Sequence, residues 1–287
     1  MVALPTETVY GLAADAANAS AVRRVYAIKG RPADHPLILH LPDPEHLERY
    51  AAAVPLAARK LVARFWPGPL TIVVQKSAEV PYAVTGGQDT VALRMIDHPL
   101  TRAILRRFGH AVAAPSANRF GRISPTTADH VRADLGDEVD LIVDGGPSRI
   151  GVESTIVDIT GDIPAILRHG AIGPSALAAA LGAPVIARSG GDVRAPGMLA
   201  SHYAPRARLV VAAAGLLATT LDRERARGGR VAELTLPEDA RAAARTLYAS
   251  LRALDGQFYD TIVVALPPDT EANAAVRDRL MRAAAPR

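Results

Sequence analysis

Short apolar runs alternate with amphipathic stretches along most of the chain. Before residue 170, the runs of strand length lie at 37–41, 71–74, 91–95, 111–114, 141–143, 155–157 and 165–167. Runs of this length separated by helix-like periodicity are typical of an α/β protein. We therefore expect an α/β fold in which these runs form a sheet.

Two helices can be placed between the runs from their end signals. The first spans 20–29 and ends at Gly30, since glycine is a common residue just after a helix. The second opens at Asp97-His98-Pro99 and ends at Gly109. Its apolar residues, which we expect to face the core, are Leu100, Ile104, Leu105 and Phe108.

The periodicity disappears between 188 and 207, where Gly190, Gly191, Pro196, Gly197 and Pro205 indicate a linker. Beyond it, apolar runs at 209–213, 231–236 and 261–266 are each followed by a helix-like segment, which predicts a small βαβαβα unit. This unit contains no G-x-G-x-x-G motif, so nothing indicates that it binds a dinucleotide. We therefore expect a large domain at 1–187, a linker at 188–207 and a small C-terminal α/β domain at 208–287.

Composition narrows the class of protein. Hydrophobic residues make up 49% of the 287, which indicates a folded chain and not a disordered one. The absence of Cys excludes disulfides, thiolate metal sites and a cysteine nucleophile. No apolar run is long enough to span a bilayer, and polar residues at 6–8 argue against a signal peptide. We expect a cytoplasmic protein without membrane attachment.

The charge of the chain is mildly positive, with a formal net charge of +4. Such an excess is as consistent with solubility as with a nucleic-acid partner. Only three of the 33 basic residues are Lys, and one of them is Lys29. A retained Lys in an Arg-rich chain indicates that a compact ammonium group is needed at that position.

Several short motifs carry most of the polar chemistry. They are P-T-E-T-V-Y-G-L at 5–12, K-G-R-P at 29–32, H-P-L-I-L-H at 35–40, A-P-S-A-N at 114–118, G-V-E-S-T at 151–155 and H-Y-A-P at 202–205. None is decisive by itself, but their order and spacing over roughly two hundred residues are specific. Together they resemble the YrdC family of L-threonylcarbamoyladenylate synthases, in its long two-domain form. The chain has no Walker P-loop, H-E-x-x-H or kinase signature.

The residues by themselves leave structural alternatives open. The Thr6 and Thr8 hydroxyls could be turn and cap groups, and Lys29 and Arg31 could interact with the C-terminal end of a helix dipole. A lone His on a strand, such as His40, is more often structural than a ligand. A helix cap at Ser124 or Thr126 would likewise explain the hydroxyls that follow the A-P-S-A-N motif.

The resemblance implies a YrdC-like open twisted sheet domain followed by a linker and a small Rossmann-like domain. It also implies the roles of individual residues. Lys29 and Arg31 would be the catalytic cations that face the triphosphate of ATP. Further ATP contacts would come from His35, Thr90, Ser116, Asn118, Ser124, Arg168 and Tyr203. The threonine contacts would come from Thr8, His40, Arg94, Ala114 and Ser154.

The implied reaction makes L-threonylcarbamoyl-AMP from L-threonine, bicarbonate and ATP, with release of pyrophosphate. Mg²⁺ would arrive with ATP and need no metal site on the protein. A downstream tRNA threonylcarbamoyl transferase would use the product to modify an adenosine next to the anticodon. Glu7 and Asp144 are carboxylates without an assigned role. We expect a monomer.

An alternative of another class is an RNA-binding protein for double-stranded RNA or tRNA, without adenylate synthesis. The sequence offers no aromatic stacking pair and no Lys/Arg run for it, so at most weak RNA binding is expected. The family also has a helix and a strand ahead of the P-T-E-T motif. We therefore expect an N-terminal extension of about 15–25 residues in the natural product, because Leu4 on an uncovered edge strand would be exposed.

Overall fold

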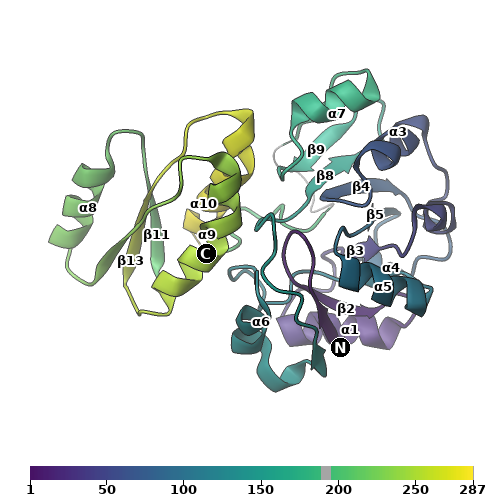
Figure 1. Ribbon diagram of the computed structural model, residues 1–287, viewed down its shortest axis with the longest axis horizontal. Coiled ribbons are helices and arrows are strands. Elements are labelled where there is room, and N and C mark those ends of the chain that lie inside the picture. The colour runs from purple at the N-terminus through teal and green to yellow at the C-terminus, as the bar shows by residue number, and fades with distance from the viewer. Residues whose placement is uncertain (189–194, 287) are drawn as a thin grey trace.

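The computed structural model describes residues 1–188 and 195–286. Within them the chain forms two lobes that lie side by side, each with its own sheet (Figure 1). The large sheet ends at Ala187 and the small sheet begins at Arg208, on either side of the expected linker. Gly190 and Gly191 lie outside the described residues. The expected α/β class is confirmed.

The large lobe contains a mixed sheet whose strand order is β10-β9-β8-β4-β5-β3-β6-β2-β1-β7. Each apolar run predicted before residue 170 corresponds to one of these strands. The strands are β1 Val2–Leu4, β2 Gly11–Asp15, β3 Ile38–His40, β4 Leu70–Gln75, β5 Thr90–Arg94, β6 Val112–Ala113, β7 Leu141–Ile142, β8 Thr155–Asp158, β9 Ala165–Arg168 and β10 Ile186–Ala187.

Helices and short 3₁₀ turns connect these strands. They are α1 Ala19–Lys29, η1 Pro44–His46, α2 Leu47–Tyr50, α3 Leu56–Phe65, α4 Tyr82–Thr85, α5 Pro99–Phe108, α6 Ala128–Leu135, η2 Gly136–Glu138 and α7 Pro174–Leu181. Helix α1 begins where the Asn18 side chain accepts hydrogen bonds from the first-turn amides. It ends at Gly30, whose positive φ of 63° suits glycine. The predicted first helix is therefore confirmed.

Helix α5 is confirmed, but its buried face differs from the prediction. Leu105 is buried and Ile104 half-buried, whereas Leu100 and Phe108 are 41% and 43% exposed. The buried stripe runs through Thr101, because its hydroxyl donates a hydrogen bond to the Pro5 carbonyl and so tolerates burial. The next helix, α6, is capped by Thr127 and not by Ser124 or Thr126.

Strand β1 is not an edge strand. It pairs antiparallel with β2 on one side and parallel with β7 on the other. Leu4 is buried in a cluster with Ala13, Leu105 and Val112. The expectation that Leu4 would be exposed was wrong, so this reason for an N-terminal extension no longer holds.

The small lobe is the predicted βαβαβα unit. Its three strands form a parallel sheet in the order β11-β13-β12. The elements are β11 Arg208–Ala212, α8 Leu217–Ala226, β12 Val231–Leu234, α9 Ala240–Asp255, β13 Thr261–Ala265, η3 Glu271–Asn273 and α10 Ala274–Ala284. Helices α9 and α10 lie on the side that faces the large lobe, and α8 lies on the far side (Figure 1).

One apolar core crosses the boundary between the lobes. It combines Leu247 and Val276 of the small lobe with Val9, Ile123 and Val152 of the large lobe. Tyr203, in the described part of the linker, belongs to the same core. The lobes are therefore packed together by buried apolar contacts. No helix in the described part of the chain is long and apolar enough to cross a membrane.

The turn after α4 gives a direct test of the fold. Gly86 has a φ of 61°, and a Cβ there would lie 2.2 Å from the Asp34 carbonyl oxygen. Gly87 has a φ of 84°, but a Cβ added there would meet nothing within 4 Å. We expect Gly87→Ala to lower the free energy of unfolding by about 1 kcal/mol, through backbone strain alone. Gly86→Ala should lower it by about 2–4 kcal/mol. Urea unfolding measures both, and equal losses would contradict the role of the clash.

Candidate functional site

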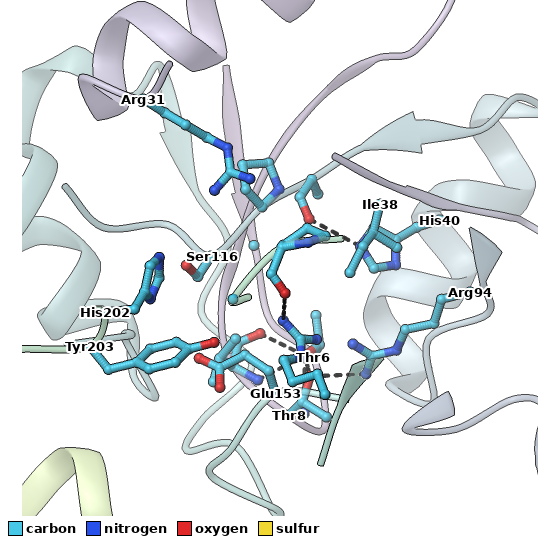
Figure 2. A pocket seen from close by; sticks show the side chains of 17 residues that line it. Thr6, Thr8, Arg31, Ile38, His40, Arg94, Ser116, Glu153, His202 and Tyr203 are labelled. Atoms are coloured by element: carbon cyan, nitrogen blue, oxygen red, sulfur yellow. Dashed lines mark hydrogen bonds between the residues drawn. The ribbon is translucent and has the colours of Figure 1, made fainter. Parts of the chain in front are cut away.

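A small cavity lies where the large lobe meets the C-terminal part of the linker, residues 195–207. Its volume is about 50 Å³, far below the few hundred Å³ typical of a site that holds a drug-sized ligand. Figure 2 shows Arg31, His40, Arg94 and Ser116 around it, with His202 and Tyr203 on one side. The predicted site residues in its wall are Thr8, Arg31, His40, Arg94, Ala114, Ser116, Arg168 and Tyr203.

Two guanidinium groups give the cavity its positive charge. Arg31 follows the C-cap of α1, and its Nη2 donates to the Pro36 carbonyl over 3.0 Å. Arg168 ends β9 and donates to the carbonyls of Ser154 and Pro196 over 3.0 and 3.1 Å. Neither forms an ion pair with a carboxylate in residues 1–188 or 195–286. Burial lowers the pKa of Arg31 to about 10, so it stays cationic at neutral pH.

Lys29 lies behind the cavity wall. Its ammonium group donates to the Ser116 and Asn118 carbonyls over 2.6 and 2.5 Å. These bonds fix the loop that carries Ser116 and occupy two of the three N–H groups. Burial, and then the charge of Arg31, lowers the pKa of Lys29 well below its ordinary value. In this conformation Lys29 supports the loop and does not itself line the cavity.

Arg94 ends β5, across the cavity from Arg31 (Figure 2). In the sheet it is paired with His40 of β3 and with Thr71 of β4. Its Nη2 donates to the Glu7 carboxylate over 2.5 Å and to the Thr8 hydroxyl over 2.9 Å. Both charged side chains are almost fully buried. Glu7, which the sequence left unassigned, therefore holds Arg94 in place.

His40 presents a free acceptor beside Arg94. Its Nε2 lies 3.1 Å from the Ala114 carbonyl, so the proton must be on Nε2 if the two groups bond. Its Nδ1 is buried and has no hydrogen-bond partner in the described residues. Burial, and then the charge of Arg94, lowers the pKa of His40 to about 3. The ring is therefore neutral at physiological pH and can accept a hydrogen bond through Nδ1.

The other predicted residues lie around the cavity without lining it. Ser154 bonds the Thr71 hydroxyl over 2.7 Å and accepts from Arg168 over 3.0 Å. The Asn118 amide donates to the carbonyls of its own loop, while its Oδ1 is buried and has no partner in the described part of the chain. Ser124 donates to the Glu153 carboxylate. Thr90 is buried at the start of β5, and His35 contacts the Phe120 ring.

Residues of the C-terminal part of the linker close the cavity. Pro196, Gly197, His202 and Tyr203 all line it. Tyr203 is buried with a positive φ of 63°, a conformation that non-glycine residues seldom adopt. Its hydroxyl is buried and has no hydrogen-bond partner among residues 1–188 and 195–286. Gly197 is so close that a Cβ there would lie 2.2 Å from this hydroxyl.

Sequence reasoning missed Glu153 and His202. Glu153 lines the cavity, and its carboxylate accepts hydrogen bonds from Ser124, Tyr248 and Arg279. Its place inside the G-V-E-S-T motif was a usable signal. Its partners in the small lobe, Tyr248 and Arg279, lie 95 and 126 residues away in sequence and belong to no such motif. Asp144, the other unassigned carboxylate, caps its own turn by accepting from the Gly146 amide.

Two family profiles cover almost the whole chain. The family described as "Telomere recombination" matches residues 1–170, and "Threonylcarbamoyl-AMP synthase, C-terminal domain" matches residues 169–285. The "Threonylcarbamoyl-AMP synthase" of Bacillus subtilis is 41% identical, over 99% of this chain and 89% of the relative. The protein of that name from Schizosaccharomyces pombe is 33% identical, over 99% and 84%.

A solved structure extends the similarity to the arrangement of both lobes. The structure described as "Crystal structure of P. abyssi Sua5 complexed with L-threonine" has a TM-score of 0.94 and 38% identity. The match covers 99% of this chain and 90% of that one. The resemblance found in the motifs is therefore confirmed over both lobes, and the chain belongs to the threonylcarbamoyl-AMP synthase family.

Proposed function

We propose that this chain makes L-threonylcarbamoyl-AMP from L-threonine, bicarbonate and ATP, with release of pyrophosphate, for modification of tRNA next to the anticodon. Family membership over both lobes supports this activity. The observation that carries it in the structure is the cavity itself. Its wall combines two buried cations without carboxylate partners among the described residues with a neutral His, a Thr hydroxyl and a buried Arg.

The chemistry needs positioning more than a protein nucleophile. The threonine amine attacks bicarbonate to form a carbamate, with loss of water. A carbamate oxygen then forms a bond to the α-phosphorus of ATP, and the bond from that phosphorus to the pyrophosphate oxygen breaks. Negative charge builds up on the leaving pyrophosphate, and fixed cations stabilise it without reorganising.

The nucleotide end of the cavity is proposed to lie at Arg31 and Arg168. Their remaining N–H groups can bind phosphate oxygens, because backbone carbonyls satisfy some donors without cancelling the charge. Ser116 lies in the same wall. Asn118, Ser124, His35 and Thr90 remain proposed ATP contacts, and they require the cavity to widen before they can reach a ligand.

The threonine end is proposed to lie at Thr8, His40, Arg94 and the Ala114 backbone. A guanidinium fork suits the substrate carboxylate, and Arg94 is held in a fixed orientation by Glu7 and the Gly68 carbonyl. The Nδ1 of neutral His40 can accept a hydrogen bond from the threonine amine or hydroxyl. Ser154, bonded to both Thr71 and Arg168, connects the two ends.

Mg²⁺ is proposed to enter as the companion of the triphosphate, which it would help to neutralise. In the described residues no group of three or more His, Asp or Glu side chains could hold a metal ion. The carboxylate in the cavity wall, Glu153, already accepts from Arg279 and Tyr248. These side chains suit a metal ion that keeps its ligands on the phosphates and water.

The decisive experiment is a pyrophosphate-release assay on the purified chain. Synthesis predicts release only when ATP, threonine and bicarbonate are all present. An RNA-binding protein without synthesis, the alternative that the family match does not favour, predicts no release under any of these conditions. The downstream transferase, the cytoplasmic location and the monomeric state remain part of the proposal.

Arg31 and Lys29 are expected to differ in their effects. Arg31→Ala should raise the KM for ATP by about tenfold or more, because a charge-assisted phosphate contact is worth about 1.5–3 kcal/mol. Lys29→Ala should lower both activity and thermal stability, since the Ser116 and Asn118 carbonyls lose their donor. Steady-state kinetics and thermal unfolding separate the two effects. An unchanged KM for ATP in Arg31→Ala would remove Arg31 from the nucleotide site.

Arg94 should contribute to the affinity for threonine and not to the affinity for ATP. Its loss would leave the buried Glu7 carboxylate unpaired, so the variant is best made as Arg94→Ala with Glu7→Gln, and Glu7→Gln alone is the matched control. Relative to that control, threonine affinity should fall about tenfold or more, with a small change for ATP. Calorimetry showing equal losses for both ligands would contradict this assignment.

The residues that close the cavity must move when ATP binds, because about 50 Å³ cannot hold a nucleotide. We expect ATP with threonine to change amide hydrogen exchange at 195–205, the segment that carries Tyr203. Exchange in β13, Thr261–Ala265, should stay as it was and is the internal control. If exchange at 195–205 does not respond to either ligand, Tyr203 does not act as part of a lid.

A further inference from the structure

Arg279 of α10 is the largest completely buried side chain among the described residues. It belongs to the small lobe, far in sequence from every predicted site residue. Burying a guanidinium is expensive unless its donors are satisfied and its charge is paired. Its partners therefore show what the small lobe contributes to the site.

Those partners lie in three segments that carry predicted site residues, namely Ser154, Arg168 and Tyr203. Nε donates to the Glu153 carboxylate over 2.7 Å, and Nη2 donates to the His169 carbonyl over 2.9 Å. The guanidinium carbon also lies 5.0 Å from the centre of the Tyr203 ring, within cation–π range. Glu153 precedes Ser154, and His169 follows Arg168. The Arg279 side chain thus contacts the G-V-E-S-T motif, the residue after β9 and the closing segment, by which we mean residues 195–205.

Glu153 is held from both lobes. Tyr248 of α9 donates to its carboxylate over 2.9 Å, and Ser124 of the large lobe also donates to it. The buried carboxylate carries a charge because Arg279 compensates for its loss of water. Desolvation alone raises the pKa of Glu153, but the charges of Arg279 and Arg168 and the Ser124 hydrogen bond lower it to about 2.

We propose that the small lobe completes the nucleotide end of the site, with Arg279 as the positioning residue that holds and compensates the Glu153 carboxylate beside Arg168. This inference rests on the proposed synthase activity. Without Arg279, an unpaired carboxylate would remain in the wall beside Arg168. It would repel the triphosphate and attract Arg168, which has no carboxylate partner of its own in the described residues.

The test compares four full-length proteins with the wild type: Arg279→Met, Glu153→Gln, the double variant, and the control Arg277→Met. Arg277 lies on the same helix but pairs with Asp269, whose side chain is 88% exposed. The assay is pyrophosphate release with ATP and threonine varied separately, together with thermal unfolding of each protein. Arg279→Met should raise the KM for ATP about tenfold or more, with about a twofold change for threonine. Arg277→Met should match the wild type.

Rescue separates positioning from a purely structural ion pair. If the harm comes from the uncompensated carboxylate, Glu153→Gln added to Arg279→Met should restore the KM for ATP to within about threefold of the wild type. A purely structural pair predicts a lower melting temperature with unchanged KM values. Equal rises in the KM for ATP and for threonine, or no rescue by the double variant, would overturn the proposal.

A pH profile gives an independent readout. The groups that face Glu153 are Arg279 of α10, Tyr248 of α9, Arg168 of β9, Ser124, and His202 and Tyr203 of the closing segment. Without Arg279 the pKa of Glu153 rises, and the carboxyl becomes neutral once the pH falls below it. The KM for ATP of Arg279→Met should therefore approach the wild-type value as the pH falls from about 8 to 5.5. A ratio of the two KM values that does not depend on pH would count against the proposal.

Tyr248→Phe provides a second test of the proposal if Arg279→Met fails to fold. It removes one donor to Glu153 and keeps the ring. It should raise the KM for ATP by about threefold or more, and this effect should disappear in the Glu153→Gln background. An unchanged KM for ATP in Tyr248→Phe would overturn the proposal. A wild-type chain without pyrophosphate release would instead refute the proposed function.

Discussion

Buried guanidinium groups determine how this molecule is organised, and their partners differ from one end of the cavity to the other. Arg31 and Arg168 donate to backbone carbonyls, which satisfy hydrogen bonds but leave the positive charge intact. Arg94, at the proposed amino-acid end, is paired with the buried Glu7 carboxylate. Arg279 pairs with Glu153, so that this carboxylate does not cancel the charge of Arg168 beside it. The wall is thus strongly cationic where phosphates are proposed to bind and close to neutral where an amino acid is proposed to bind.

One of these groups, Arg279, also links the two lobes. The apolar core that joins them contains Val9, Val152 and Tyr203, so the hydrophobic contact between lobes passes directly under the site. Arg279 and Tyr248 reach through this core to Glu153. A change in the relative position of the lobes would consequently alter the cavity wall. The closure of the site therefore depends on how the small lobe packs against the large lobe.

Local patterns in the sequence predicted the secondary structure well because the physical signals are local. A run such as 155–157 is apolar and bounded by turn residues, and it forms β8. Gly30 ends α1 because only a few residues accept its left-handed backbone. The apolar pattern predicted the wrong buried face for α5, where the polar Thr101 is buried. The hydrogen bond from Thr101 to the Pro5 carbonyl, which makes this burial possible, cannot be seen in the sequence.

The sequence by itself determined the α/β class, the two sheets and, through the spacing of six motifs, the family and the proposed reaction. Only the tertiary structure decided which motif residues share the cavity wall. Lys29 lies behind that wall because its ammonium group is bonded to two carbonyls. Leu4 is buried because it packs against Leu105 of α5 and Ala13 of β2. Glu153 meets Tyr248 and Arg279, which lie 95 and 126 residues further along the chain. Pairing between such distant positions depends on how the lobes pack, which no local pattern of residues encodes.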